Sequence, residues 1–286
     1  MTVTTRHEVS AGVGPAPSID LRGEGTSPGE LVRAVWRARQ LLVILARKEF
    51  HVRYRRASFG LLWAVGLPLL QALVMAVVFS RVAHIAKAPH YSVFMLSGMT
   101  GWVFFTAALA AGSTAIVDGT ELSSRVYFPR PLLPLVQVAS SLYGYVVTLG
   151  ILLVLCPLLH VGLGWRTLVL VPASLLLVAL VTGFCLVLSA LHVYFRDIRY
   201  LVAAALMVWM YVTPIIYPPA DAPGKLRLLL QANPMTGVTD LFHLGTVGAA
   251  GPLAGAVVVA VAWTVVLLGC GLWLQARFDR VFADLL

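Results

Sequence analysis

Charged side chains are scarce in this chain. Asp, Glu, Lys and Arg make up 12% of its 286 residues, about half of the roughly 25% that is usual in soluble domains. Hydrophobic residues reach 59% at the same time. A soluble fold cannot cover so much apolar surface, so the composition excludes an ordinary soluble domain.

Cysteine is also rare, and its three positions follow no known pattern. Cys156, Cys185 and Cys270 fall in different apolar stretches, with no CxxC or His-rich spacing around them. Such spacing is what a disulfide framework or a metal site requires. We therefore interpret the three thiols as small hydrophobic packing residues.

Motifs for chemistry inside a membrane are missing as well. The sequence contains no HExxH, no GxSxG and no pair of carboxylates within its apolar stretches. His90, His160 and His192 fall at the edges of these stretches and are interpreted as interfacial. Ionisable groups within the bilayer mark intramembrane enzymes and ion-coupled carriers, so both classes are disfavoured.

A phosphate-binding loop of the GxxxxGK[ST] type is absent too, because Lys48, Lys87 and Lys225 all lie outside such a motif. The chain cannot hydrolyse ATP by that route. If it moves a substrate against a gradient, the energy must come from another polypeptide.

Long apolar stretches are what the chain does have. Six runs contain no Asp, Glu, Lys or Arg: 57–80, 88–117, 131–165, 167–195, 200–220 and 241–276. Each is at least as long as the ~20 residues that cross a bilayer as a helix. They lack the period-two alternation of barrel strands. The sequence therefore predicts an all-α polytopic membrane protein with six transmembrane helices.

The basic residues indicate how these spans are oriented. A cytoplasmic N-terminus puts 16 of the 21 Lys and Arg residues on the cytoplasmic side and five on the outer side. Basic residues near span ends are retained in the cytoplasm, so we expect both termini there, in a protein of the inner (plasma) membrane. The net charge of +9 is then an orientation signal, and no nucleic-acid partner is expected.

An amphipathic helix is predicted before the first span. Residues 1–29 are rich in Gly, Pro, Ser and Thr and are predicted to be a disordered cytoplasmic tail. Ser27, Pro28 and Glu30 have the spacing of an N-cap, a first-turn proline and a capping-box acid, which predicts an interface helix over 30–56. Its apolar stripe consists of Leu31, Val35, Ala38, Leu42 and Leu45. This pattern favours a helix along the membrane surface, which either anchors on anionic lipid or also docks a partner.

Two cytosolic turns separate the spans. The turn at 118–131 mixes charges with Tyr127 and Phe128, a composition typical of an interaction surface, although it also fits an ordinary turn bounded by prolines. In the short turn between the fourth and fifth spans, we expect Arg196 and Asp197 to pair or to extend along the interface.

The outer region, 218–250, contains two apolar pieces at 226–232 and 236–247, separated by Asn233 and Pro234. Both pieces are too short to cross the bilayer. They predict a pair of re-entrant or interfacial half-helices that cap a pathway, because broken backbone at membrane depth needs protein or water around it.

Four stretches in unbroken order carry a resemblance to a known family. They are VRYRRASFGLLWAVGLPLLQALVMAVVFSRV (52–82), VYFPRPLLPL (126–135), YFRDIRYLVAAALMVWMYVTPIIYP (194–218) and NPMTGV (233–238). Together with the basic interface helix, they resemble the ABC-2 type permeases that export polysaccharides, O-antigens and teichoic acids. The resemblance covers about residues 30–286.

This resemblance implies an ABC-2 transmembrane domain over 30–286 that forms a homodimer with two separate nucleotide-binding ATPase subunits. ATP and Mg²⁺ would bind to those subunits, so no cofactor and no catalytic residue is expected in this chain. The cargo would be a lipid-linked glycan moved outward from the cytoplasm. Arginine outnumbers lysine 18 to 3, which is similar to actinobacterial members of the family. The candidate cargoes are therefore a galactan of the cell wall and an O-antigen-like glycan.

Candidate site residues follow from the same resemblance. The ATPase docking surface would contain Glu49, Arg53, Tyr54, Arg55, Glu121, Arg125, Tyr127 and Phe128. The substrate pathway would be lined by Gln71, Trp102, Phe104, Phe105, Tyr143, Trp209 and Tyr211. The half-helices within 226–247 would match the outer gate of the family. The dense aromatic residues of the second span also fit a plain interfacial belt.

Two other functions stay open. An ABC-2 permease for a drug or small lipid would share the fold and the docking surface, and a pathway lined by aliphatic side chains would favour it. A membrane-embedded glycosyl or acyl transferase needs a positioned acid or base near the bilayer surface, for which Asp197 and Asp240 are the candidates.

Overall fold

The computed structural model describes residues 27–55, 66, 70, 74, 90–120, 129–217, 224–248 and 253–278. This part of the chain forms helices and turns and contains no strand, which confirms the all-α class for it. The elements are α1 (Pro28–Arg37), α2 (Arg39–Arg55), α4 (Tyr91–Asp118), α6 (Leu132–Leu158), the short 3-10 helix η2 (Trp165–Val169), α7 (Leu170–Tyr194), α8 (Ile198–Val212), α9 (Gly224–Ala232), α10 (Pro234–Thr246) and α11 (Leu253–Phe278).

Four segments are long and apolar enough to cross a membrane. They are Tyr91–Asp118, Leu132–Leu158, Trp165–Tyr194 and Ala254–Arg277. These segments correspond to the second, third, fourth and sixth predicted spans. The first predicted span, 57–80, lies outside the described residues apart from three single positions, and so does the predicted tail up to residue 26.

The fifth and sixth predicted spans differ from the structure at their boundaries. α8 has 15 residues, which at 1.5 Å per residue is about 22 Å, less than the ~30 Å hydrocarbon core. It stops before Thr213, whose backbone is extended (φ −92°, ψ 132°), because Pro214 disfavours helical geometry at the residue before it. The sixth predicted span, 241–276, begins too early, because residues 241–246 belong to α10 and α11 begins at Leu253.

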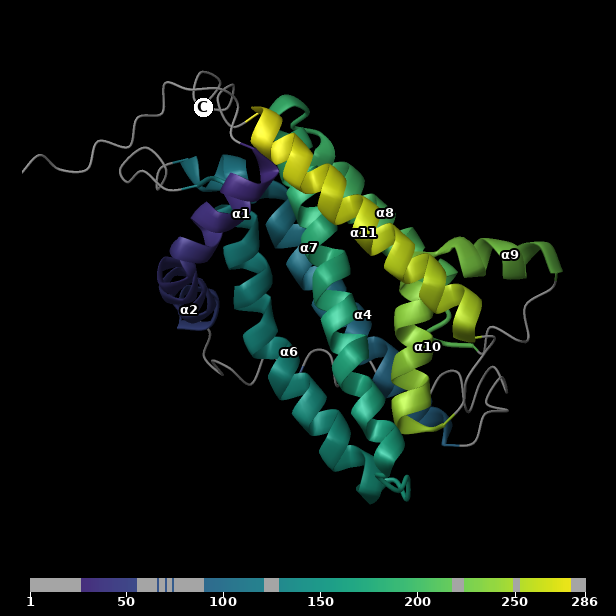
Figure 1. Cartoon of the computed structure of the whole chain (residues 1–286). Coiled ribbons are helices and arrows are strands. Elements are labelled where there is room, and N and C mark those ends of the chain that lie inside the picture. The colour runs from purple at the N-terminus through teal and green to yellow at the C-terminus, as the bar shows by residue number, and fades with distance from the viewer. Residues whose placement is uncertain are drawn as a thin grey trace, which may run out of the picture.

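α4 forms the centre of the bundle. It packs against α6, α7, α8 and α10, and 78% of its most apolar stretch is buried, against 22% for α11. α11 lies along α7 on the outside (Figure 1). The close approach of α4 and α7 depends on Gly112, where a Cβ would lie 2.4 Å from Cys185 Sγ. Cys185 and Cys156 are buried, as the packing interpretation requires, whereas Cys270 is exposed.

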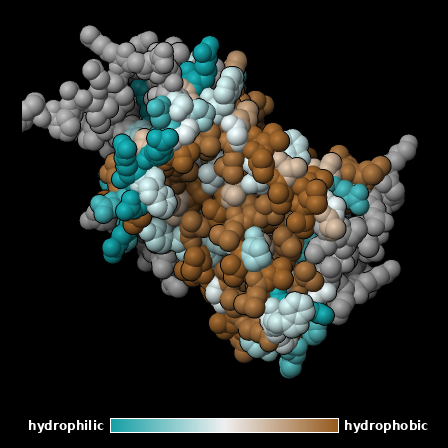
Figure 2. Space-filling view, viewed as in Figure 1, coloured by the Kyte–Doolittle hydropathy of each residue, from teal (hydrophilic) through white to brown (hydrophobic). Residues whose placement is uncertain are grey.

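The visible surface has an apolar middle and hydrophilic ends. Figure 2 shows hydrophobic residues over the sides of the bundle, with hydrophilic residues near α1 and α2 and near the turn that leads from α6 into α7. An apolar band between polar ends is the surface expected of helices in contact with lipid. We call the end where α4 and α7 finish and α6 and α8 begin the α2 end.

The N-terminal helix starts as predicted. The Glu30 backbone N–H donates to Ser27 Oγ, and the Ser27 backbone N–H donates to the Glu30 carboxylate, which confirms the capping box. The hydrogen bond from the Ser27 backbone lowers the pKa of Glu30. The helix does not run unbroken to residue 56, because a turn at Ala38 divides it into α1 and α2.

The apolar stripe of these two helices packs against protein. Val35, Ala38, Leu41, Leu42 and Leu45 lie on a buried cluster of Ala115, Leu132, Leu133 and Val136. The interpretation that this stripe lies on the membrane is therefore wrong. Another side of the helices carries the exposed residues Val32, Trp36 and Val43, and the Arg39 guanidinium lies 5.4 Å from the centre of the Trp36 ring. This second side is the one available to lipid.

The predicted break between the two short outer helices is confirmed at Asn233. Its side-chain oxygen accepts a hydrogen bond from the Met235 backbone N–H at 3.0 Å and so caps α10. α10 packs against α4, η2, α7 and α11 and is buried on most of its surface. The entry of α9 and α10 into the bilayer stays a prediction.

Gly237 determines how closely α10 approaches α11. A Cβ at this position would lie 2.3 Å from the backbone oxygen of Ala256. We expect Gly237→Ala to lower the free energy of unfolding by about 1–3 kcal/mol, because the clash outweighs the gain of about 1 kcal/mol in helix propensity. Thermal unfolding of the purified protein in detergent measures this change. The control is Gly255→Ala, which faces open space, and equal midpoints for both variants would contradict the packing argument.

Candidate functional site

A cavity of about 580 Å³ opens at the α2 end. Three helices and one turn residue line it: Leu45, Lys48, Glu49 and Arg53 of α2, Ala111, Thr114, Ala115 and Asp118 of α4, Gly119, and Leu133, Val136 and Gln137 of α6. Its lining thus combines two cations and two anions with several apolar side chains. A concave surface of this composition is suited to receive a segment of another protein.

Two contacts hold α2 in place as one wall of the cavity. Arg53 Nη2 donates to Gln137 Oε1 of α6 at 3.4 Å. Three residues earlier, the Phe50 ring lies 5.1 Å from the Tyr143 ring, with an angle of 40° between the planes. Because these contacts lie on consecutive turns of α2, the position of the cavity wall follows the position of α6.

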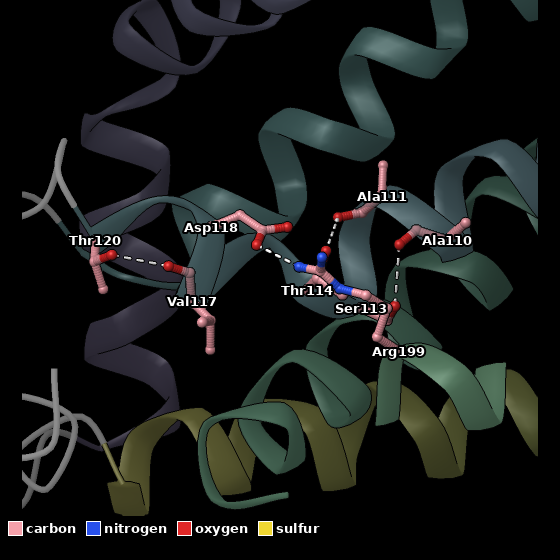
Figure 3. Close-up of polar contacts among 8 residues, drawn as sticks. All are labelled: Ala110, Ala111, Ser113, Thr114, Val117, Asp118, Thr120 and Arg199. Atoms are coloured by element: carbon pink, nitrogen blue, oxygen red, sulfur yellow. Dashed lines mark hydrogen bonds and ion pairs between the residues drawn. The ribbon is translucent and has the colours of Figure 1, made fainter. Parts of the chain in front are cut away.

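An ion pair joins the end of α4 to the beginning of α8 at the same end of the bundle. Arg199 Nη2 lies 2.5 Å from Asp118 Oδ1, and both side chains are 53% exposed. Figure 3 shows this pair beside the last turns of α4. At such exposure an ion pair contributes about 0–1 kcal/mol. Arg196 and Asp197, which are both described, do not pair with each other, so that one of the two predicted alternatives is wrong.

The structure places part of the predicted docking surface in this cavity. Glu49 and Arg53 line it. Tyr54 and Arg55 belong to the last turn of α2, but their side chains are outside the description. The remaining predicted docking residues, Glu121, Arg125, Tyr127 and Phe128, also lie outside the described residues. Their segment follows Asp118 and Gly119, which line the cavity.

The predicted pathway residues fall into two groups. Trp102, Phe104 and Phe105 of α4 are buried within the chain. Phe105 packs edge-to-face against Trp209 of α8 at 5.3 Å. Tyr143 and Tyr211, in contrast, are exposed. Gln71 lies outside the described residues. The buried aromatic rings therefore join α4 to its neighbours. Tyr211 is exposed, and Tyr143 packs against Phe50 on one side and keeps part of its ring exposed.

Asn233 is the centre of a network at the opposite end of α8. Its Oδ1 accepts from Trp209 Nε1 at 2.9 Å, and its Nδ2 donates to the Val212 oxygen at 3.3 Å and to Thr213 Oγ1 at 3.1 Å. Together with the cap on α10, one buried amide thus fixes the last turn of α8 against the first turn of α10.

The two acids considered for a transferase lie in different surroundings. Asp240 is buried in α10 at 1% exposure, so a substrate cannot reach it in this conformation. Asp197 is exposed in the turn before α8. No group of three His, Cys, Asp or Glu side chains comes together within the described ranges.

Sequence reasoning missed the Asp118–Arg199 pair and the tertiary bonds of Asn233. The ion pair joins residues 81 positions apart, and no local pattern relates such positions. For Asn233, the signal was present in its place before Pro234, because Asn followed by Pro is typical of an N-cap and a first helical residue. That signal predicts the cap but not the bonds to α8.

Apolar helices around a central helix, with a polar cavity at one end and short broken helices at the other, are the arrangement of a helical membrane protein. Residues 40–245 match the ABC-2 type transporter family, and the chain belongs to this family. It is accordingly a transporter subunit and not an enzyme.

Within this family, the chain is similar to curated proteins that are named for O-antigen export. The chain is 30% identical over 215 residues to the O-antigen export system permease protein RfbA of Myxococcus xanthus, which is 74% of this chain and 82% of the relative. It is 26% identical over 211 residues to a protein of the same name from Klebsiella pneumoniae, which is 72% of this chain and 81% of the relative.

Removal of the Asn233 side chain tests the network at the last turn of α8. Loss of a cap costs about 0.5–2 kcal/mol, and a buried donor left without a partner, here Trp209 Nε1, costs about 1–3 kcal/mol. We expect Asn233→Ala to lower the midpoint of thermal unfolding in detergent by several degrees. Gln231→Ala, which shortens a nearby amide in α9, is the matched control, and a similar loss in both variants would refute the role of the network.

Proposed function

We propose that this chain is the permease subunit of an ATP-driven exporter that moves a lipid-linked polysaccharide outward across the cytoplasmic membrane. The observation that carries the proposal is the 30% identity over most of both chains to a permease named for O-antigen export. Membership of the ABC-2 type transporter family agrees with it. The composition of the chain makes a lipid-linked cell-wall galactan the narrower candidate for the cargo.

In this proposal the α2 end faces the cytoplasm. The excess of Lys and Arg on the side of the N-terminus supports this orientation. Arg53, Arg130, Arg196 and Arg199 of the described part all belong to the α2 end. Both chain termini then lie in the cytoplasm.

The α2-end cavity is the proposed docking site for a nucleotide-binding ATPase subunit. The chain itself lacks a GxxxxGK[ST] loop, so the partner would bind ATP and Mg²⁺ and supply the energy. Lys48, Glu49 and Asp118 give the cavity charges of both signs, which would orient an incoming helix. In the sequence, Glu121 and Arg125 follow shortly after Asp118 and Gly119, which line the cavity, and the proposal includes both residues in the docking surface.

A second copy of the chain would complete the pathway. α8 carries five large exposed side chains: Tyr200, Leu201, Met207, Val208 and Tyr211. An apolar face of this size on a helix shorter than the bilayer is suited to a partner of similar composition. Tyr143 and Tyr211 are the exposed members of the predicted pathway set and are proposed to contact the glycan. Trp102, Phe104, Phe105 and Trp209 would support them from behind.

A depletion experiment tests the cargo. Cells depleted of the chain should accumulate a lipid-linked glycan on the inner face of the membrane, while its synthesis continues, and an ATPase should co-purify with the tagged chain. Extraction and mass analysis of the lipid fraction measure the first, and protein identification measures the second. Accumulation of a small lipid without sugar would instead support a lipid or drug permease, and failure of glycan synthesis itself would support a transferase.

Variants of the cavity test the docking site. Ala111→Trp fills the cavity and Glu49→Arg reverses a charge in its wall. Each should weaken binding of the ATPase about tenfold, which corresponds to about 1.4 kcal/mol, as measured by co-purification at graded salt. Substitution of Glu121 or Arg125 by Ala should separate ATP turnover from export without unfolding the permease. Arg166→Glu in η2, at the other end of the bundle, is the control and should bind as the unmodified chain does. Equal binding by all variants would place the docking site elsewhere.

A further inference from the structure

α8 is attached to the bundle unevenly along its length. The described helix buries Val202, Leu206 and Met210, which form a single stripe with one residue per turn. At its last turn, Trp209 is bonded to the buried Asn233, which also holds the residues that follow. The last turn of α8 is therefore fixed to α10 by hydrogen bonds. A single buried stripe resists tilting of the helix less than contacts on several sides would.

The first turn of α8 is attached by an ion pair in addition to the packing of Ile198 against the main hydrophobic core. Arg199 is the second residue of α8, close to the positive end of its helix dipole, and Asp118 is the last residue of α4, at the negative end of its dipole. Each charge is thus disfavoured by its own helix. The ion pair neutralises both charges at these unfavourable helix ends. When the pair separates, each charge is again left beside a helix end of its own sign.

The carboxylate of this pair also belongs to the cavity at the α2 end. Asp118 of α4 lines the cavity together with Lys48 and Arg53 of α2. A segment that enters the cavity therefore meets the same carboxylate that holds the first turn of α8. Because both groups of the pair are about half exposed, water can replace their contact at small cost, so the pair is able to open and close.

We propose that the Asp118–Arg199 pair is a releasable tie through which occupation of the α2-end cavity moves α8. The proposal rests on the proposed function, in which an ATPase subunit enters the cavity. Its entry draws Asp118 away from Arg199, and the first turn of α8 swings while the last turn stays fixed at Asn233. The exposed face of α8 then moves relative to the second copy and opens the pathway. Asp118 and Arg199 are positioning residues in this step.

The test uses the permease and its co-purified ATPase, reconstituted together in vesicles, and measures glycan exported per ATP hydrolysed. Asp118→Asn and Arg199→Gln should each lower this ratio by about threefold to fivefold, the range that a surface ion pair can supply. The double variant with Asp118→Arg and Arg199→Asp should export more per ATP than either single variant. Arg196→Gln, which removes an exposed arginine three residues before Arg199, is the matched control and should keep the full ratio.

A cross-linking measurement separates a tie that must open from a contact that only stabilises the fold. Asp118→Cys and Arg199→Cys are combined in a Cys270→Ser background, because Cys270 is exposed while Cys156 and Cys185 are buried. A short bifunctional thiol reagent should stop export and leave ATP hydrolysis running, relative to the same variant before linking. Unchanged export after linking would overturn the proposal.

The outcomes distinguish the tie from the function on which it rests. Absence of glycan export by the unmodified complex would contradict the proposed function and with it the tie. Export by the unmodified complex, with full ratios in both single variants or no recovery in the double variant, would overturn the tie and leave the proposed function in place. Unfolding midpoints in detergent identify any variant that lowers export by misfolding, and the cross-linked pair then decides.

Discussion

The burial of α4 is the constraint on which the rest of the structure depends. A bilayer core offers no hydrogen-bonding partners, so each span satisfies its own backbone and the helices associate by close packing. α4 is enclosed by α6, α7, α8 and α10, and its two ends take part in different contacts. At one end is Asp118, and at the other the Tyr91 hydroxyl donates to the Ile216 oxygen at 2.9 Å. A central helix enclosed in this way connects the cavity to the outer helices as a stiff element. α8 lies beside it and is attached by one buried stripe, by an ion pair at its first turn and by the Asn233 network at its last turn.

Much of this architecture could be predicted from the sequence because the bilayer imposes a length. Runs without charge gave four of the spans. The capping box at Ser27 gave one helix start, and the pair Asn233–Pro234 gave the break between two short helices, since these signals act within a few residues. The length of α8 was overestimated, because apolar character continues beyond the helix that Pro214 ends. The stripe from Val35 to Leu45 was assigned to lipid because a hydrophobic face does not identify its neighbour.

The candidate site was harder to predict from the sequence, because its residues come from different helices and no local pattern shows which side chains meet. Glu49 and Arg53 were found through a resemblance, and the structure brings them to a cavity with residues of α4 and α6 that no spacing relates to them. The aromatic residues of α4 were predicted to meet a glycan, but aromatic rings serve packing and recognition equally well, and only the fold separates the buried Phe105 from the exposed Tyr143. An exporter needs force at one face and an opening at another, and the described helices offer a charged cavity for the first and an unevenly held helix for the second.

The two sides of α1 meet different surroundings. One side packs on α4 and α6, and the other presents Trp36 beneath the Arg39 guanidinium, an arrangement suited to the level of phospholipid headgroups. Because α2, which follows α1 directly after the turn at Ala38, forms a wall of the cavity, we expect the charge of the headgroups to influence the shape of that cavity. We therefore expect transport rates measured in vesicles to depend on the lipid composition of the vesicles.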